Sequence, residues 1–475
     1  MNQKSSSLPN ITTHFADWYH EVVYQSKMAD HAPVRGCMVI MPYGYAVWEN
    51  IQKILDAKIK ETGHQNAAFP LLIPESFLKK EAKHVAGFSP ELAVVTHAGG
   101  KELEEPLVVR PTSETIIHYM FARWLTSWRD LPLKINQWCS VVRWEMRTRP
   151  FLRTTEFWWQ EGHTAHETHE EARQEVKTML DVYVDLIENY LAIPVVAGVK
   201  SETEKFAGAD LTCTVEGMMQ DGKALQMGTS HMISQNFAKV FEMKFQDRNG
   251  NEAYPYLTSW GVTTRLIGAL IMTHGDQKGL IMPPRVAPYQ IVIIPIIKTG
   301  SEDVVLNAAY ALKKELEREF RVVIDTDETK TPGAKFFHWE LKGVPVRIEI
   351  GPRDIEQKTV KVVDRLGLEN TNVKQAELTQ HLKYHLEKIQ TTLLERATAR
   401  RKSQWHKGAR LEDFKESLEQ QGGFYQTGWC RRIECEDVLK THKATIRAVL
   451  PEKTFSICFN CDQESPSDIL AAKSY

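Results

Sequence analysis

Three observations predict an α/β protein of several domains. The 475 residues would fill two to four domains of ~100–200 residues each. The first half pairs strand-like segments around polar turns, which favours an antiparallel sheet, whereas strands and helices alternate beyond Pro288. Residues 393–475 change composition again and hold four of the seven cysteines. We therefore place the domains at 1–285, 286–392 and 393–475.

Composition limits the class of protein. Hydrophobic residues make up 42% and charged residues 25%, as in ordinary globular proteins. A formal net charge of −2 gives no overall field that attracts nucleic acid, so RNA would have to bind local basic patches. The N-terminus lacks the apolar core of a signal peptide, and the longest apolar run, 289–297, is far shorter than the ~20 residues that span a bilayer. We expect a soluble cytoplasmic protein whose cysteines are thiols or metal ligands.

Residue periodicity predicts the elements of the first domain. Apolar residues recur at helical spacing from Tyr45 to Glu61, and Gly63 ends that helix. An arginine-rich loop, MRTRPFLR, separates two of the predicted strands. The other elements predicted are strands over 67–74, 133–146, 154–163, 211–219 and 223–231, and helices over 167–190 and from about Gly261 onward.

The second domain follows a proline cluster and shows a βαβαβ pattern, which is typical of a small, separate α/β domain. The predicted elements are a strand over 291–296, a helix over 301–320, a strand over 321–325, a helix over 334–342 and a strand over 344–350.

Arginines are the candidate phosphate ligands. The chain has no G-x-x-x-x-G-K-[ST] loop, and no G-x-G-x-x-G turn follows a strand. One hairpin loop, by contrast, carries Arg143, Arg147, Arg149 and Arg153, whose planar forks suit pairs of phosphate oxygens. Glu145 and Glu156 alternate with them and would hold arginine side chains or a Mg²⁺-bound nucleotide. Taken alone, the loop is equally compatible with a solvated basic hairpin.

Three segments together resemble the class II aminoacyl-tRNA synthetases. GCMVIMPYGYAVWENIQ with AAFPLLIP resembles motif 1, VVRWEMRTRPFLRTTEF resembles motif 2, and GVTTRLIGAL resembles motif 3 with its single arginine, Arg265. Their order and spacing imply a class II catalytic domain with an antiparallel sheet, and the motif 1 resemblance implies a homodimer.

The resemblance extends over nearly the whole chain to the prolyl-tRNA synthetase family of the archaeal and eukaryotic-like type. The segments that carry it are RPTSE (110–114), WQEGHTAH (159–166), KFAGAD (205–210), QMGTSH (226–231) and SWGVTTR (259–265). It implies a ligase that uses ATP with Mg²⁺ to form prolyl-adenylate and then transfers L-proline to tRNA(Pro).

The resemblance also implies a proline site. Thr112 and Glu114 would accept the two N–H bonds of the secondary ammonium, which suits one hydroxyl and one carboxylate. Alternatively, Thr112 or Ser113 caps the helix that follows. The residues implied to line an apolar slot for the ring are Phe88, Trp159, His163, Phe206, His231 and Gly261. The spacing of His163, His166 and His169 also fits a metal site, although no nearby cysteine completes it; Trp158 is expected in the core.

For ATP, the resemblance implies that Arg143 contacts the substrate carboxylate and the α-phosphate, where charge develops during transfer. Arg143, Arg265 and Glu114 are the implied catalytic residues. Phe157 would stack on adenine, with Arg265 on the opposite face or at the terminal phosphate. The remaining ATP-binding candidates are Glu145, Arg153, Thr154, Gln226 and Thr229, and Glu216 with Gln226 is a candidate near Mg²⁺.

The second domain resembles the anticodon-binding domain of this synthetase group. The implied anticodon contacts are Glu340, Arg347, Arg353 and Asp354, because arginine pairs a guanine edge and carboxylates accept from guanine N–H groups. The alternative is that these are ordinary surface charges. The segment 396–410 holds six Lys or Arg and no acid, and it is either a phosphate contact or a solvated helix end.

Four cysteines in the tail form two closely spaced pairs, Cys430-x4-Cys435 and Cys458-x2-Cys461. This spacing suits a tetrahedral structural Zn²⁺, as in the C-terminal domain of many family members, and the alternative is a pair of buried or reactive thiols. Cys37, Cys139 and Cys213 are expected in the core. Tyr475, at the end of the chain, is expected near the active site.

Other functions remain open from the sequence alone. A serine or threonine synthetase shares the fold, a regulator that binds uncharged tRNA shares the domains, and a zinc-ribbon RNA-binding module needs only the tail. A slot of proline's size discriminates weakly against alanine and cysteine, since one methylene is worth only ~1–3 kcal/mol. Only about 95 residues separate His163 from Ser259, so we expect no hydrolytic editing domain between motifs 2 and 3.

Overall fold

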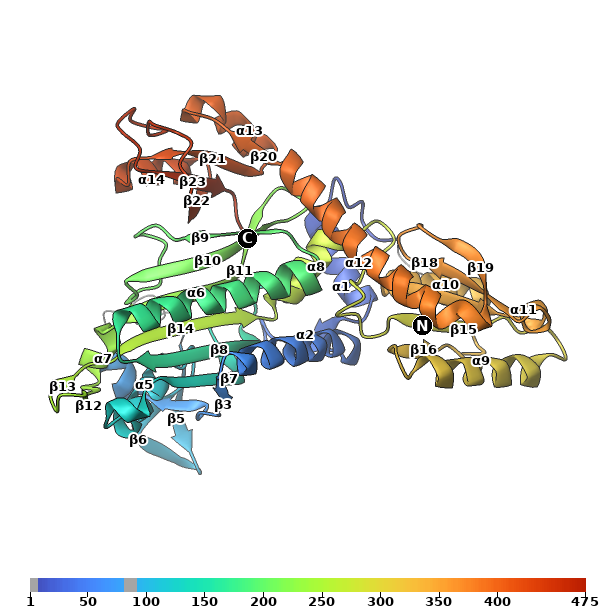
Figure 1. Cartoon of the computed structure of the whole chain (residues 1–475), viewed down its shortest axis with the longest axis horizontal. Coiled ribbons are helices and arrows are strands. Elements are labelled where there is room, and N and C mark those ends of the chain that lie inside the picture. The colour runs from blue at the N-terminus through green and yellow to red at the C-terminus, as the bar shows by residue number, and fades with distance from the viewer. Residues whose placement is uncertain (1–6, 81–91) are drawn as a thin grey trace.

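An eleven-stranded sheet runs through the molecule (Figure 1). The computed structural model describes residues 7–80 and 92–475. Within the first domain, neighbouring strands pair antiparallel except β3, which is parallel to β7, so the predicted antiparallel sheet is confirmed. In order across the sheet, these strands are β9 (Val195–Val199), β10 (Leu211–Met218), β11 (Ala224–Ser234), β14 (Tyr256–Thr263), β8 (Glu156–His166), β7 (Leu133–Val142) and β3 (Gln65–Asn66).

Two long helices pack on this sheet. Helix α6 (His169–Asp185) contacts β10, β11 and β14, and it continues into a π-helical turn at Leu186–Tyr190. A capping box between Thr168 and Glu171 sets its first turn. Helix α2 (Pro42–Glu61) contacts α6, and it ends where Gly63 takes a φ of +88°.

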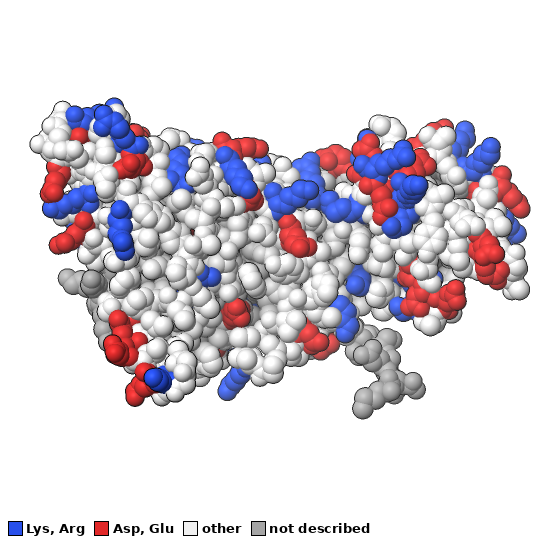
Figure 2. Space-filling view, turned by 90° about the horizontal axis from the view of Figure 1, so that it is seen from below, with Lys and Arg blue, Asp and Glu red and all other residues white. Residues whose placement is uncertain are grey.

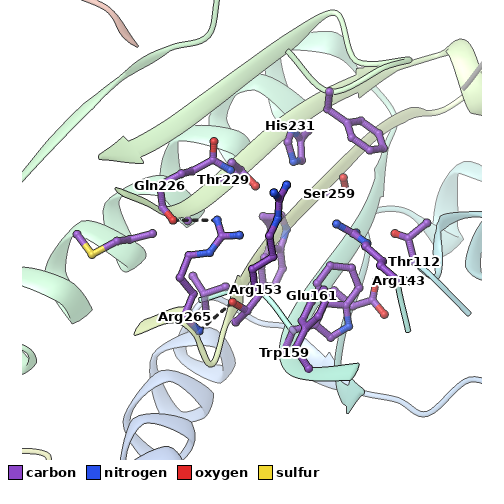
Figure 3. Close-up of a pocket in the computed structure, with 18 of the residues that line it drawn as sticks. Thr112, Arg143, Arg153, Trp159, Glu161, Gln226, Thr229, His231, Ser259 and Arg265 are labelled. Atoms are coloured by element: carbon purple, nitrogen blue, oxygen red, sulfur yellow. Dashed lines mark hydrogen bonds between the residues drawn. The ribbon is translucent and has the colours of Figure 1, made fainter. Parts of the chain in front are cut away.

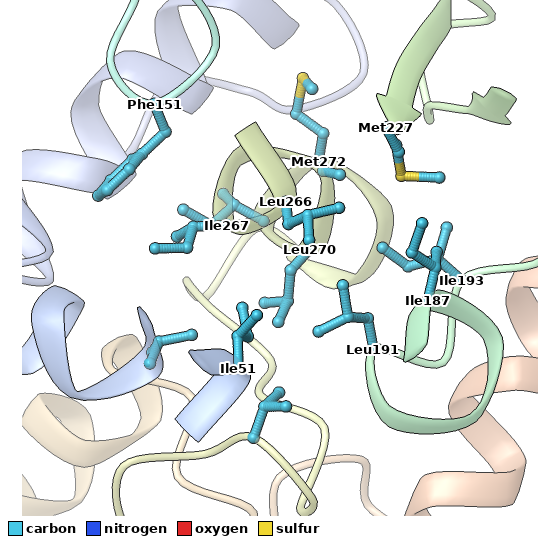
Figure 4. Close-up of a cluster of buried hydrophobic side chains, with 14 of the residues drawn as sticks. Ile51, Phe151, Ile187, Leu191, Ile193, Met227, Leu266, Ile267, Leu270 and Met272 are labelled. Carbon is cyan, nitrogen blue, oxygen red and sulfur yellow. The ribbon is translucent and has the colours of Figure 1, made fainter. Parts of the chain in front are cut away.

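A third helix, α8 (Arg265–His274), lies inside the core rather than on it. Every residue from Leu266 to His274 is buried, as expected for a helix that is apolar all round. Figure 4 shows Ile51, Leu191 and Met227 pointing at this helix from three different elements. Packing on all sides therefore fixes the position of Arg265 at the start of the helix.

The rest of the first domain surrounds this core. Strands β4 (Leu72–Pro74), β6 (Lys101–Val109) and β5 (Ala93–Ala98) form a separate three-stranded sheet. The remaining elements are α1 (Phe15–Gln25), β1 (Ala29–His31), β2 (Met38–Ile40), α3 (Glu75–Lys80), α5 (Glu114–Trp124), α7 (Asn236–Val240), β12 (Phe245–Gln246) and β13 (Glu252–Ala253).

The second domain has the predicted βαβαβ order. Strand β15 (Ile291–Pro295) is parallel to both its neighbours, and two antiparallel strands complete the five-stranded sheet. The other elements are α9 (Glu302–Leu316), β16 (Val322–Ile324), α10 (Pro332–Leu341), β17 (Val346–Ile350), α11 (Pro352–Gln357), β18 (Thr359–Asp364) and β19 (Asn370–Lys374).

The 26-residue helix α12 (Leu378–Ser403) runs from this domain to the C-terminal domain (Figure 1). There, the pairing of Val449 with Val199 joins the C-terminal strands to β9, so the large sheet continues into this domain. The C-terminal elements are β20 (Trp405–Lys407), α13 (Lys415–Gln420), β21 (Phe424–Trp429), α14 (Ile433–Thr441), β22 (Thr445–Val449) and β23 (Ser467–Ala472). No helix in the described ranges is both long and apolar enough to cross a membrane.

Several local predictions were wrong. The segment 67–74 is not one strand, because only its last residues pair, as β4. Gly261 lies within β14, and the helix begins at Arg265. Trp158 is 40% exposed rather than core, since it alternates with cavity-facing neighbours on β8. Of the three cysteines expected in the core, Cys139 is buried, whereas Cys37 and Cys213 are half-buried.

Candidate active site

A cavity of about 350 Å³ opens on one face of the first domain's sheet, where the side chains of three strands meet. The period of two along a strand explains this convergence. Trp159, Glu161 and His163 alternate on β8, and the ladder sets Ser259 beside His163 and His231. Figure 3 shows Arg143, Arg153 and Arg265 extending into the same space from the hairpin and from α8.

The three arginines Arg143, Arg153 and Arg265 lie together in one part of the cavity lining. Arg143 donates from Nε to Pro111 O at 3.0 Å and lies 5.5 Å from the Phe157 ring. Arg265 donates to the carbonyls of Leu152 at 3.2 Å and Gln226 at 3.3 Å. Burial, and then the charges of Arg153 and Arg143, lower the pKa of Arg265 to about 10. A polyanion placed among these side chains would relieve their repulsion.

Two buried acceptors meet at the other end of the cavity. Thr112 donates its hydroxyl to the Glu114 carboxylate, and both residues line the cavity. Ser113 occupies the N-cap of α5 but makes no side-chain capping bond, and Thr112 bonds to Glu114 instead. The structure therefore does not support the capping alternative. Glu114 begins α5, where the helix dipole favours a negative charge.

The aromatic residues predicted to hold a small ring line one section of the cavity. The rings of Phe206 and His231 lie 4.9 Å apart, and His231 Nδ1 lies 3.0 Å from Thr212 Oγ1. Burial, and then the nearby His163, lower the pKa of His231 to about 3, so this ring is neutral. Trp159, His163 and Gly261 complete the lining, whereas Phe88 falls outside the described residues.

Glu161 is a cavity residue that the sequence reasoning missed. Its carboxylate lies 3.0 Å from His163 Nε2 and accepts from Gln137 at 2.8 Å. Burial opposes the charge on His163, but Glu161 and then Glu114 outweigh it and raise the pKa of His163 above its usual value. Strand alternation was the available signal, because Glu161 lies midway between Trp159 and His163.

All eight residues that the sequence predicts to bind ATP line this cavity, namely Arg143, Glu145, Arg153, Thr154, Phe157, Gln226, Thr229 and Arg265. Glu145 is already paired with Arg153 at 3.0 Å. The placement of Glu216 beside Mg²⁺ was wrong. Its carboxylate is fully buried outside the cavity lining, where Lys200 and Arg447 already neutralise it.

Family models match the chain in three consecutive parts: the class II tRNA synthetase core domain (G, H, P, S and T) over residues 95–274, an anticodon-binding domain over 290–385, and a prolyl-tRNA synthetase C-terminal domain over 411–475. Proline–tRNA ligase of Alkaliphilus oremlandii is 50% identical over 464 residues, 97% of this chain and 96% of that protein.

Proline–tRNA ligase 2 of Clostridioides difficile is 51% identical over 466 residues, with coverage of 97% and 96%. The chain belongs to the prolyl-tRNA synthetase family. A crystal structure of the Cryptosporidium parvum prolyl-tRNA synthetase, complexed with halofuginone and AMPPNP, superposes with a TM-score of 0.93 at 42% identity and 99% coverage of both chains. The predicted family and fold class are therefore confirmed.

The part that matches the prolyl-tRNA synthetase C-terminal domain holds a cluster of four thiols. The Sγ atoms of Cys430, Cys435, Cys458 and Cys461 all lie within 4.8 Å of one another. Their spacing and their sulfur donors fit a tetrahedral Zn²⁺. Among the described residues, no comparable group includes His163, His166 or His169, and the first two lie on β8 rather than on a helix.

The part that matches the anticodon-binding domain separates its four candidate residues. Glu340 and Arg347 line a second cavity of about 370 Å³, whereas Arg353 and Asp354 lie on α11 beyond the far end of β17. Asp354 accepts from Gly351 N at 2.8 Å and so caps its own helix. Glu340 is paired with Lys278 at 2.9 Å.

The other basic and C-terminal candidates have structural partners. Arg400 and Arg401 donate to the carbonyls of Thr273 at 2.8 Å and Val195 at 2.6 Å, which fastens the end of α12 to the catalytic core. The Tyr475 hydroxyl donates to Asp221 at 2.7 Å. The Tyr475 ring lies 5.5 Å from Arg149 and lines a neighbouring cavity, not the one described above.

Proposed function

We propose that this chain joins L-proline to tRNA(Pro) in two ATP-dependent steps. In the first step, a carboxylate oxygen of proline attacks the α-phosphorus of ATP, and the bond to the β-phosphate bridging oxygen breaks. In the second, a terminal ribose hydroxyl of the tRNA attacks the carbonyl carbon, and AMP leaves. The observation that carries this proposal is the meeting of three arginines with a ring-sized aromatic slot in one cavity.

At the proline end, the Thr112 hydroxyl and the Glu114 carboxylate bind the imino nitrogen, and Trp159, Phe206 and His231 enclose the ring. Support comes from their shared lining of the cavity and from the burial of both acceptors. Burial disfavours a carboxylate charge that is not fully paired, so a cationic ligand beside Glu114 would be stabilised.

At the ATP end, Arg143 lies between the two substrates and stabilises the charge that develops on the α-phosphate. Arg153 and Arg265 hold the outer phosphates, Phe157 stacks on adenine, and Glu145, Thr154, Gln226 and Thr229 complete the nucleotide site. Catalysis then consists of orientation and electrostatic stabilisation, with no covalent nucleophile. Mg²⁺ bound with ATP would supply further neutralisation of phosphate charge, and the oxygens of Glu145 and Gln226 suit that hard cation.

The C-terminal cysteines bind a structural Zn²⁺. All four ligand positions belong to the protein, so such a site keeps none open for chemistry. Glu340 and Arg347 read anticodon bases in the second cavity, and Arg353 and Asp354 contact the anticodon from α11. We keep the domain boundaries at 1–285, 286–392 and 393–475.

We further propose that the protein is a cytoplasmic homodimer. Figure 2, which views the molecule from the side of β5 and β6, shows few charged side chains across the middle of that face. The segments near β1, β2, β4 and β5 also expose large apolar side chains, as expected for a surface that a second copy covers. These are Val34, Val39, Leu71, Leu72 and Val94.

Proline-dependent exchange of labelled pyrophosphate into ATP tests the function. We expect exchange with proline and not with serine or threonine. Arg143→Ala should lower it by about 10²–10³ or more, the effect of losing one transition-state donor. Arg147, a candidate phosphate ligand by sequence, is exposed and lies outside the cavity lining, so Arg147→Ala should retain the parent activity. Exchange with another amino acid would reassign the substrate, and no exchange at all would favour a non-catalytic tRNA-binding protein.

A further inference from the structure

The loop between β9 and β10, residues 200–210, forms one wall of the proline slot. It contributes Glu204 and Phe206 to the cavity lining. It contains only turns, such as the bond from Lys205 N to Ser201 O at 2.9 Å. Phe206 itself is held by its backbone N–H, which donates to Thr212 Oγ1 at 3.0 Å. A segment with so few internal bonds needs outside contacts to keep its shape.

The second half of the loop is held by the catalytic core, for example by the bond from Asn236 Nδ2 to Gly208 O at 3.0 Å, whereas its first residues are held by the C-terminal domain. The hydroxyls of Ser201 and Thr203 both donate to Glu436 Oε1, each at 2.6 Å. Glu436 lies on α14, 235 residues from Ser201 in the chain, and is only 2% exposed. Hydrogen bonds to a buried carboxylate are short and strong, so they hold the loop far better than exposed contacts would.

A second contact from the same domain holds the start of the loop. Lys200 Nζ donates to Arg447 O at 3.0 Å and to Glu216 at 2.8 Å. The C-terminal domain therefore fixes three positions, Lys200, Ser201 and Thr203, within the six residues that lead to Phe206. The last of these contacts, at Thr203, lies three residues before Phe206, which lines the slot.

We propose that Glu436 is a positioning residue for proline binding, acting through Ser201 and Thr203 to hold Phe206 against His231. This rests on the proposed function, since it concerns the proline slot of that site. Glu436 follows Cys435 directly, so the helix that carries a thiol of the metal cluster also carries the loop anchor. At the nucleotide end of the cavity, the hydrogen bonds given for Arg143 and Arg265 go to Pro111, Leu152 and Gln226, none of which belongs to this loop.

Kinetics of proline-dependent pyrophosphate exchange test the proposal. In Glu436→Ala we expect the KM for proline to rise about tenfold, as for a net loss near 1.4 kcal/mol from two bonds. The KM for ATP and kcat should change less than about twofold, because those interactions are intact. Glu436→Gln keeps one acceptor oxygen and should restore part of the affinity. Glu434→Ala, an exposed position on the same helix, is the matched control and should behave as the parent.

A double-mutant cycle separates positioning from general damage. Thr203→Val should raise the KM for proline by itself, and combining it with Glu436→Ala should add less than the sum of the two effects. Full additivity, an unchanged KM for proline in Glu436→Ala, or equal losses in both KM values would overturn the proposal. Should Glu436→Ala fail to fold, Glu436→Gln and Thr203→Val decide the question on the same criteria.

Hydrogen exchange gives a readout that does not depend on activity. Amides of residues 200–210 should exchange faster in Glu436→Ala than in the parent, while those of β8 stay protected. If the parent shows no proline-dependent exchange of pyrophosphate, the proposed function fails. The exchange rates of the loop amides still show whether Glu436 anchors the loop, and unchanged rates would contradict that.

Discussion

The two accessory domains are attached to the catalytic core in different ways. The C-terminal domain extends the catalytic sheet and shares a buried ionic group, in which Glu216 pairs with Lys200 and with Arg447. The anticodon-binding domain has a sheet of its own, and it is attached by backbone bonds such as Leu280 N to Leu341 O at 2.9 Å and by exposed pairs such as Lys278 with Glu340. The C-terminal domain is thus part of the active-site architecture, whereas the anticodon-binding domain is positioned beside it.

This difference has an energetic consequence. Apolar residues of both domains pack together where the sheet continues, including Met218 and Ala224 from the core and Phe424 and Leu470 from the C-terminal domain. Substitutions that destabilise the C-terminal domain should therefore also weaken proline binding. Substitutions in the anticodon-binding domain should leave adenylate formation unchanged and lower only the rate of tRNA charging.

Loss of a metal ligand should produce the largest effect. Structural Zn²⁺ sites have apparent binding free energies of about 10–16 kcal/mol in zinc-finger peptides, so Cys435→Ser should abolish tight metal binding and loosen the C-terminal domain. Metal content and thermal unfolding measure this, and pyrophosphate exchange should fall with them. Cys37→Ser, outside the cluster, is the control. Unchanged metal content in Cys435→Ser would contradict the site.

Breaking the buried ionic group of Glu216, Lys200 and Arg447 should lower the free energy of unfolding more than breaking an exposed pair at the other domain boundary. Glu216→Gln leaves Lys200 and Arg447 as neighbouring buried cations, and we expect the free energy of unfolding to fall by about 3–5 kcal/mol. Lys278→Ala removes an exposed partner of Glu340 at the boundary with the anticodon-binding domain, for which about 0–1 kcal/mol is typical. Urea unfolding measures both, and equal losses would refute the contrast drawn between the two attachments.

Substitutions in the anticodon-binding domain should separate tRNA use from adenylate formation. Arg347→Ala should weaken tRNA charging by roughly 1–3 kcal/mol, which is a rise of about 5- to 150-fold in the KM for tRNA, while pyrophosphate exchange stays at the parent level. Arg318→Ala, exposed on the same domain, should leave both unchanged. A fall in pyrophosphate exchange for Arg347→Ala would show that this domain does act on the catalytic site.

The sequence predicted best what depends on local pattern. The two strands of the arginine-rich hairpin and the apolar helix that carries Arg265 are both properties of short segments, and the arginines of these segments line one cavity. The resemblance supplied the family and the residue roles, and the roles stay predictions. Side-chain alternation along β8 would have predicted Glu161 as a cavity residue between Trp159 and His163, but this residue was missed.

What the sequence could not predict depends on contacts between distant segments. Glu216 was expected near Mg²⁺, but its partner Arg447 lies 231 residues away, and no periodicity connects the two. The bonds from Ser201 and Thr203 to Glu436 are of the same kind. The buried carboxylates of Glu216 and Glu436 belong to the packing of two domains against each other, which only the folded chain shows.

The smallest expected effect is the pH dependence of the stability that the Glu216 carboxylate contributes. Burial opposes the charge on Glu216, but Arg447 and Lys200 outweigh it and hold the pKa of that carboxyl below 4.5. Its contribution to stability is therefore fully present above pH 4.5 and is lost as the pH falls through the lower folded-state pKa. Because Gln has no such titration, the difference in unfolding free energy between the parent and Glu216→Gln should stay constant from pH 8 to about pH 5 and narrow below that. Urea unfolding across this range measures the difference, and a gap that widened toward acid would mean that the lysine and arginine do not stabilise the charged carboxylate.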